Sequence, residues 1–226
     1  MDMIFDPSPN FDERDGPVSV LVMHYTGMPT AHSAITLLKS PRAKVSAHYV
    51  VDEDGTVYNL VPEAKRAWHA GISYWRGQRM LNDASVGIEI VNPGHEWGYR
   101  PFPAAQMQAA RALAQGIIAR HSIAPRNVVA HSDIAPNRKQ DPGELFGWAW
   151  LAEHGVGVWT EASDPPGDLR ADLAAIGYDI GLPEKDVILA FQRHFLPNHL
   201  SGLADEPTGG RAAALRRLVD GQGNRP

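Results

Sequence analysis

The hydrophobic pattern of the first 160 residues alternates between strand-like runs and helix-like stripes. Apolar runs at 18–23 and 128–131 predict buried strands. Alternation over 85–91 predicts another strand, in which Glu89 lies on the face opposite the valine and isoleucine side chains. A carboxylate within an apolar strand is costly to bury without a partner, so we expect Glu89 to face a cleft or a cation.

Two helices and a hairpin separate these strands. Residues 47–61 read as a hairpin around Asp54-Gly55, a pair typical of tight turns between strands. Thr30 is a typical N-cap for a helix that ends before Ser40-Pro41. Residues 103–121 form a longer helix, whose predicted inward face consists of Met107, Ala110, Leu113, Ala114 and Ile117. Strands alternating with helices predict an α/β fold with helices on both sides of a mixed central sheet.

Three segments have weaker patterns. Residues 7–17 are rich in Pro, Asp and Gly and read as an irregular lead-in. Residues 62–84 have little periodicity and read as a long ordered loop, which is usually functional at that length. Residues 144–154 predict a short helix that carries tryptophans.

The composition changes around residues 161–168, which read as a linker. Beyond the linker the pattern is purely helical, with three apolar stripes: Leu169, Leu173 and Ile176; Val187, Phe191 and Phe195; and Ala212, Leu215, Leu218 and Val219. We therefore predict a larger domain over residues 1–163, which carries the candidate site, and a small three-helix domain over 164–226. The small domain is near the lower size limit for independent stability.

Composition narrows the class of protein. The 226 residues are 43% hydrophobic and 21% charged, with a net charge of −5, so nucleic acid is not an expected partner. The lack of cysteine excludes disulfides and thiolate metal sites. No apolar run approaches the roughly 20 residues of a membrane span. Met1–Asp6 has no secretory character, which favours the cytoplasm, or the periplasm if a leader has been removed.

Most of the candidate functional residues lie at or after the ends of two predicted strands. His24 and His131 each follow an apolar run, and a Pro-rich loop brings Asp141 back after His131. Two imidazoles and one carboxylate are a typical zinc ligand set that leaves a fourth position for water. Glu89 adds a carboxylate that need not bind metal, and Lys139 adds a cation. Together these residues favour metal-assisted hydrolysis.

Each residue also has a simpler interpretation when taken alone. Asp141 could cap the helix at 144–154, Glu89 could pair with an arginine, and Lys139 could be a solvated loop charge. For His48 and His69, spacing alone does not distinguish a ligand from a cleft wall.

Five motifs stand in order along the chain: His24-Tyr25-Thr26, Ser46-Ala47-His48-Tyr49, Trp68-His69-Ala70-Gly71, Asn82–Glu89 and Ala130–Gly143. With them, residues 16–160 resemble the zinc-dependent N-acetylmuramoyl-L-alanine amidases of the type-2 amidase family, most closely the bacterial amidase D group. Residues 168–220 resemble the helical peptidoglycan-binding domain of that group. The group is typically exported as lipoproteins, and no lipobox cysteine is present here.

The resemblance implies hydrolysis of the amide between N-acetylmuramic acid and L-alanine in peptidoglycan or muropeptides, in wall recycling or remodelling. It implies one zinc ion per chain and these roles: His24, His131 and Asp141 as zinc ligands, Glu89 as acid/base, Lys139 as helper cation, and His48, Trp68 and His69 as cleft residues. A non-catalytic peptidoglycan-recognition protein is the alternative, although such receptors commonly lack a complete ligand set. A third possibility is a zinc hydrolase of an unrelated amide. Oligomeric state is left open.

Overall fold

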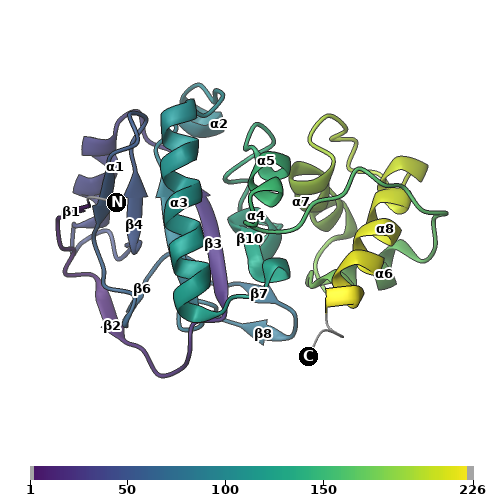
Figure 1. The fold of residues 1–226 in the computed structure, drawn as a ribbon, viewed down its shortest axis with the longest axis horizontal. Helices are drawn as coiled ribbons and strands as arrows, with labels where there is room; N and C mark the ends of the chain where they lie inside the picture. Colours follow the sequence, from purple (N-terminus) through teal and green to yellow (C-terminus); the bar gives the residue numbers. More distant parts are fainter. Residues whose placement is uncertain (1–2, 223–226) are drawn as a thin grey trace.

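The computed structural model describes residues 3–222, and its centre is a six-stranded sheet (Figure 1). In spatial order the strands are β1 (Ile4–Phe5), β5 (Val57–Asn59), β4 (Tyr49–Val51), β9 (Ser85–Ile90), β3 (Val20–Tyr25) and β10 (Val128–Ala130). The last four strands are mutually parallel, and β5 runs antiparallel to β4. The mixed sheet predicted from the sequence is confirmed.

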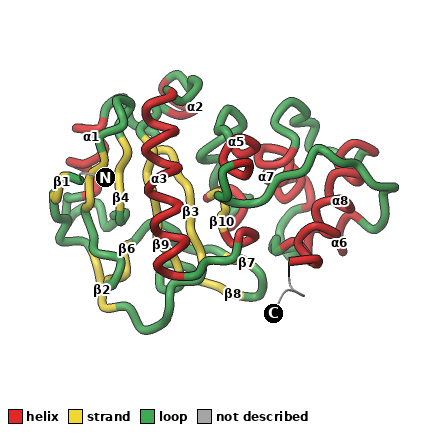
Figure 2. The backbone as a smooth tube through the Cα atoms, viewed as in Figure 1, coloured by secondary structure: helices red, strands yellow, loops and turns green. Residues whose placement is uncertain are grey.

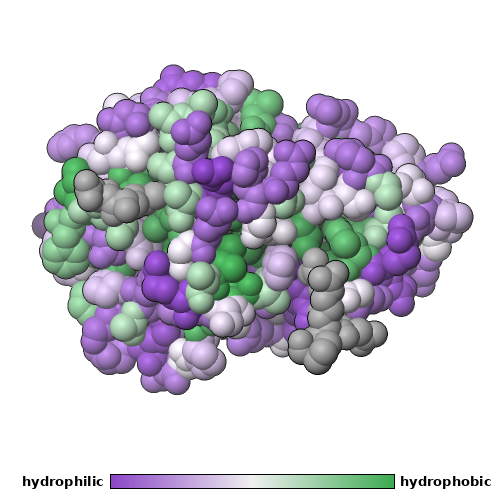
Figure 3. Space-filling model, in the orientation of Figure 1, coloured by the Kyte–Doolittle hydropathy of each residue, from purple (hydrophilic) through white to green (hydrophobic). Residues whose placement is uncertain are grey.

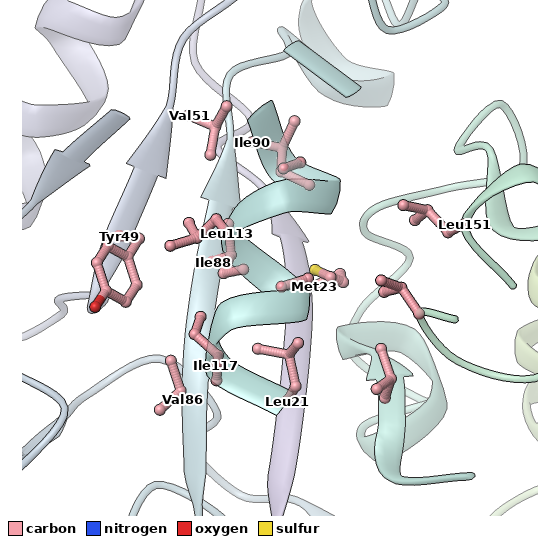
Figure 4. Packing of buried hydrophobic residues seen from close by; sticks show 14 of the residues in the cluster. Leu21, Met23, Tyr49, Val51, Val86, Ile88, Ile90, Leu113, Ile117 and Leu151 are labelled. Atoms are coloured by element: carbon pink, nitrogen blue, oxygen red, sulfur yellow. The ribbon is translucent and has the colours of Figure 1, made fainter. Parts of the chain in front are cut away.

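One face of the sheet is covered by α3 (Ala104–His121) and by the short α5 (Trp148–Glu153). The alternation predicted for β9 holds, because Val86, Ile88 and Ile90 all point toward this layer. We call this core the α3 cluster; it includes Met107 and the labelled residues Leu21, Met23, Val86, Ile88, Ile90, Leu113, Ile117 and Leu151 (Figure 4). The inward face predicted for the long helix is confirmed.

Local sequence explains the first helix and the hairpin. Helix α1 (Ala31–Leu38) begins after Thr30, whose hydroxyl accepts from the Ser33 backbone N–H at 3.1 Å. The predicted hairpin joins β4 to β5 with Gly55 at φ +90°, a conformation that favours glycine.

Other predictions from weak patterns were wrong. The predicted lead-in contains β2 (Phe11–Glu13), which pairs with β6 (Lys65–Ala67) in the predicted loop; that loop also holds the hairpin of β7 (Tyr74–Trp75) and β8 (Gln78–Arg79). Each of these strands has only two or three residues, too few for alternation to be recognised. Short helices α2 (Gly94–Trp97) and α4 (His131–Ile134) and a 3₁₀ turn (Pro125–Asn127) complete this part of the fold.

The three predicted C-terminal helices are present as α6 (Leu169–Ile176), α7 (Glu184–Phe195) and α8 (Glu206–Gln222). They gather at the end of the molecule opposite β1 (Figures 1 and 2). Of the predicted inward residues, Leu218 is wrong, because it is 37% exposed. None of the helices between residues 3 and 222 has the length and apolar character needed to cross a bilayer.

The C-terminal helices share a core with the second face of the sheet. We call this core the tail cluster; it includes Val20, Val22, Trp75, Leu81, Val129, Ile134, Leu173, Ile176, Tyr178, Val187, Phe191, Phe195, Leu215 and Val219. Helix α4 and the β7–β8 hairpin contact the tail directly, since α4 touches α7 and the Trp75 ring lies 5.2 Å from that of Tyr178. On the face in Figure 3, hydrophobic residues show in the middle of the molecule and hydrophilic ones over much of the rest. The two-domain division at residue 163 stays a prediction.

Candidate active site

The site lies where parallel strands of the sheet end together. His24 is near the end of β3, and Glu89 is its register partner on the neighbouring β9. His131 follows β10, the strand on the other side of β3, and begins α4. Carboxyl ends of parallel strands share one edge of a sheet, so backbone pairing brings these three residues together.

Three potential metal ligands converge there. Nδ1 of His24 lies 2.9 Å from Nδ1 of His131, and Oδ2 of Asp141 lies 3.1 Å and 3.0 Å from these two nitrogens. All three side chains are buried. Atoms this close together can all contact one ion, and two imidazoles with one carboxylate suit zinc.

The loop after His131 positions Asp141. Ser132 N–H donates to the Asp141 carbonyl at 3.0 Å, and Lys139 N–H donates to the Ala135 carbonyl at 3.0 Å. The proposed alternative, Asp141 as the cap of the following helix, is wrong because α5 begins only at Trp148, after Gly147.

The electrostatics favour the metal-binding forms of these groups. Burial lowers the pKa of His24 to about 4, and the neighbouring His131 acts in the same direction. Burial alone would raise the pKa of Asp141, but the His131 and His24 rings outweigh it and hold that pKa far below its usual range. A neutral imidazole and an ionised carboxylate are the forms that ligate metal.

Glu89 has the properties of a proton-transfer group. Its Oε2 is buried and has no hydrogen-bond partner among the described residues. Burial raises the pKa of Glu89 well above its usual range, Asp141 adds to this effect, and the Lys139 charge opposes it. Such a perturbed carboxyl in a cleft is typical of functional sites.

A cavity of about 340 Å³ opens over these groups, lined among others by Glu89, His131, Asp141 and Lys139. A second hollow of about 370 Å³ shares Trp68, His69, His131, Arg138 and Lys139 with it. Because the two hollows share these walls, they lie side by side, and we refer to them together as the groove.

Of the three predicted cleft residues, Trp68 and His69 line this groove. The Trp68 indole N–H donates to Asp12 of β2 at 2.6 Å, so the β2–β6 pair that the sequence did not reveal orients this ring. His69 also reaches into the metal site, where its Nδ1 lies 3.0 Å from Nε2 of His24.

His48, the third predicted cleft residue, lies outside the groove. Its side chain is fully buried, and Nδ1 accepts from the Gly87 backbone N–H at 3.0 Å, which leaves the ring proton on Nε2. That Nε2 lies 3.1 Å from the Lys65 carbonyl, so His48 ties β9 to β6. Burial lowers the pKa of His48 to about 3. His48 is not among the residues that line either hollow, so its position does not support the predicted substrate contact.

Sequence reasoning missed two residues that support the site. Ser85 lies behind His69, with its Oγ 3.2 Å from Nε2 of that ring. Asp133, in α4, is fully buried and accepts from the Tyr178 hydroxyl and the His194 Nδ1, each at 2.6 Å. The only signal for Asp133 was a polar residue two positions after His131, which is too common to interpret alone.

The mixed sheet, the buried His–His–Asp group and the adjoining carboxyl are together the features of a metal-assisted hydrolase. Residues 14–144 match the family model described as N-acetylmuramoyl-L-alanine amidase (Amidase_2), and the chain belongs to this family of enzymes.

Relatives and solved structures agree with this membership. The chain is 43% identical to the N-acetylmuramoyl-L-alanine amidase AmiD of Escherichia coli K12, over 88% of this chain and 82% of AmiD. It is 35% identical to the 1,6-anhydro-N-acetylmuramyl-L-alanine amidase AmpD of Citrobacter freundii, over 63% of this chain and 84% of AmpD. A structure of E. coli AmiD with the substrate anhydro-N-acetylmuramic acid-L-Ala-D-γ-Glu-L-Lys superposes with a TM-score of 0.80 and 38% identity, covering 92% of this chain and 98% of the chain in that structure.

Proposed function

We propose that this enzyme uses one zinc ion per chain to hydrolyse the amide between N-acetylmuramic acid and L-alanine in peptidoglycan or soluble muropeptides. The observation that carries this proposal is the convergence of His24, His131 and Asp141 beside Glu89, the register partner of His24. The substrate in the AmiD complex and the name of AmpD both point to 1,6-anhydro muropeptides, and so to wall recycling.

The three ligands fit zinc, because two imidazole nitrogens and a carboxylate oxygen leave a fourth position open in a tetrahedral site. When bound, zinc supplies Lewis acidity, which polarises the amide carbonyl and makes water acidic enough to attack near neutral pH. The protein residues then position the substrate and move the protons.

Glu89 is the residue that moves the protons. Its free Oε2 accepts a proton from the attacking water, and the same carboxyl then delivers that proton to the departing amine of L-alanine. A raised pKa suits this double role, because it makes the carboxylate a better proton acceptor than an ordinary glutamate.

Lys139 and the groove act on the substrate. The half-buried Lys139 lines both hollows. Its ammonium group stabilises the negative charge that develops on the carbonyl oxygen during attack. Trp68 and His69 form one wall against which the sugar and the first peptide residues lie. A groove of this size holds a small ligand rather than a whole glycan chain.

The direct test is digestion of anhydro and reducing muropeptides by the zinc-loaded full chain, followed by mass spectrometry. We expect a free stem peptide beginning with L-alanine and an intact amino sugar. If the chain holds stoichiometric zinc and binds muropeptide but releases no peptide, it is a recognition protein instead. If it cleaves only unrelated amides, the substrate assignment is wrong.

The role of Glu89 has its own test. Glu89→Gln keeps the shape of the side chain but removes proton acceptance, so zinc content is retained and the rate falls by about 10²–10⁴-fold. Glu96→Gln, at an exposed position, is the matched control and keeps the full rate. Near-normal turnover in Glu89→Gln would assign the proton transfer to another group.

Peptidoglycan binding by residues 164–226 stays a prediction. Pull-down with insoluble sacculi tests it.

A further inference from the structure

A chain of buried hydrogen bonds runs from the backbone to the metal site through His69. Nε2 of His24, on the side of the ring away from the other ligands, lies 3.0 Å from Nδ1 of His69. Nε2 of His69 lies 3.2 Å from the Ser85 hydroxyl oxygen, which lies 2.6 Å from the Leu81 carbonyl. His24, His69 and Ser85 are all buried.

The direction of each hydrogen bond in this chain follows from the bond between the Ser85 hydroxyl and the Leu81 carbonyl. A carbonyl oxygen only accepts, so the single proton of the Ser85 hydroxyl is donated to Leu81. The Ser85 oxygen therefore accepts from Nε2–H of His69, and the neutral His69 ring is left with an acceptor at Nδ1. His24 consequently carries its proton on Nε2 and donates it to His69, so its Nδ1 lone pair faces His131 and Asp141.

We propose that His69 and Ser85 are positioning residues that hold His24 in the Nε2–H tautomer, with its Nδ1 lone pair directed at the metal. This role is additional to the proposed substrate contact of His69, and it rests on the proposed zinc ligation. Hydrogen bonds of this kind fix both the tautomer and the orientation of a ligating imidazole.

Strand β9 is built to accommodate this arrangement. Ser85, Gly87 and Glu89 alternate along the face opposite the α3 cluster. A Cβ at Gly87 would lie 2.5 Å from Nδ1 of His69, so glycine makes room for the ring. The Asn82 side-chain oxygen accepts from the backbone N–H of His69 at 3.1 Å and of Ala70 at 2.7 Å, which fixes the loop that carries the ring.

The second imidazole of the site has no such support. Nε2 of His131 is buried without a hydrogen-bond partner among residues 3–222. The orientation of His131 is therefore set by packing and by Asp141, whereas that of His24 is set by a directional relay. Disrupting the relay affects one ligand and leaves the other in place.

Zinc affinity of the full chain, measured by chelator competition, tests the proposal with paired variants. Ser85→Ala removes the anchor of the relay and His69→Leu removes its acceptor, so each weakens zinc binding by about 10–100-fold. His69→Asn restores an acceptor oxygen near the position of Nδ1 and recovers much of the affinity. Ser132→Ala is the matched control, because it removes an equally buried hydroxyl beside His131 that has no partner among the described residues.

The tautomer itself gives a second readout that a merely structural role would not change. Nitrogen-15 NMR of the metal-free wild-type chain is expected to show His24 as the Nε2–H tautomer, and Ser85→Ala to show a mixture. An Nδ1–H tautomer in the wild type, or wild-type zinc affinity in both Ser85→Ala and His69→Leu, overturns the proposal. A wild type that binds no zinc contradicts the proposed function instead, and the NMR result still decides the relay.

Discussion

The α3 cluster and the tail cluster lie on opposite faces of the same sheet but are assembled differently. The α3 cluster is made of residues that all precede residue 160, from the sheet, α3 and α5. The tail cluster joins strand residues such as Val22 to helix residues such as Phe191, which are far apart in the chain. One face is thus completed within the catalytic segment. On the other face, α1 packs over β4, and the part over β3 and β10 depends on the last 60 residues.

The second face is also the one that carries the active site, so the tail contributes to the catalytic scaffold. Asp133, two residues after His131, accepts hydrogen bonds from Tyr178, just after α6, and His194 of α7. Arg76 of the β7–β8 turn donates its backbone N–H to the Gly177 carbonyl at 2.9 Å. These contacts hold α4, and with it the proposed metal ligand His131, against the C-terminal helices.

Ending the chain at Ser163 is the change that we expect to reduce stability most. Net stability of a domain is about 5–15 kcal/mol, and each large apolar side chain returned to water costs about 1.5–3 kcal/mol. Because the tail cluster loses most of its partners, we expect no cooperative thermal transition by circular dichroism. A shortened chain that melts like the full chain would support the independent domains predicted from the sequence.

Single truncations in each cluster should have similar effects. Phe191→Ala in the tail cluster is expected to cost about 3–5 kcal/mol and Ile117→Ala in the α3 cluster about 2–5 kcal/mol. Both side chains are fully buried. If the clusters belong to one cooperative unit, denaturant unfolding shows a single transition that both variants shift. Two transitions, each sensitive to only one variant, would mean separate domains.

A smaller change removes one contact between the tail and α4. Tyr178→Phe keeps the buried ring but leaves Asp133 without the hydroxyl donor at 2.6 Å, so it should cost about 1–3 kcal/mol. Tyr58→Phe is the control, because it removes the same hydroxyl from a half-buried tyrosine of β5, away from the tail. Denaturant midpoints of the two variants decide the matter; equal values would show that the tail contact is not important for stability.

The smallest effect is expected at the surface of the tail. Arg217 pairs with Asp164 at 2.8 Å, but its side chain is 69% exposed, and such pairs are weakened by entropy and by salt. Arg217→Ala should leave the melting temperature unchanged within error at both low and high salt. A clear decrease at low salt alone would show that this ion pair helps to attach the linker to α8.

The sequence predicted those parts of the molecule that local pattern determines. The central strands, the long helix and the three tail helices follow from periodicity, and Glu89 was placed on the correct face because alternation reports faces directly. The structure brings together His24, His131 and Asp141, which the strand ends and the family resemblance had indicated.

Features that depend on distant partners were not predictable in the same way. Strands β2 and β6 are three residues each and are defined by pairing across about 50 positions. His48 looked like a cleft residue, yet its ring contacts Arg14, β6 and β9, and no local pattern reveals these contacts. The shared tail cluster was missed for a similar reason, since an amphipathic stripe shows that a face is buried but not against what.

The register that pairs His24 with Glu89 limits where insertions and deletions can be tolerated in this fold. Ladder hydrogen bonds between adjacent strands set the spacing of the proposed metal ligand His24 and the proposed acid/base Glu89, so a one-residue insertion in either strand would turn one of these side chains to the other face. Residues 27–28 and 68–71 line the groove and lie outside that ladder. Redesign for a different muropeptide should therefore vary the loop at 27–28 and keep His69, whereas every deletion within β3 or β9 is expected to abolish turnover.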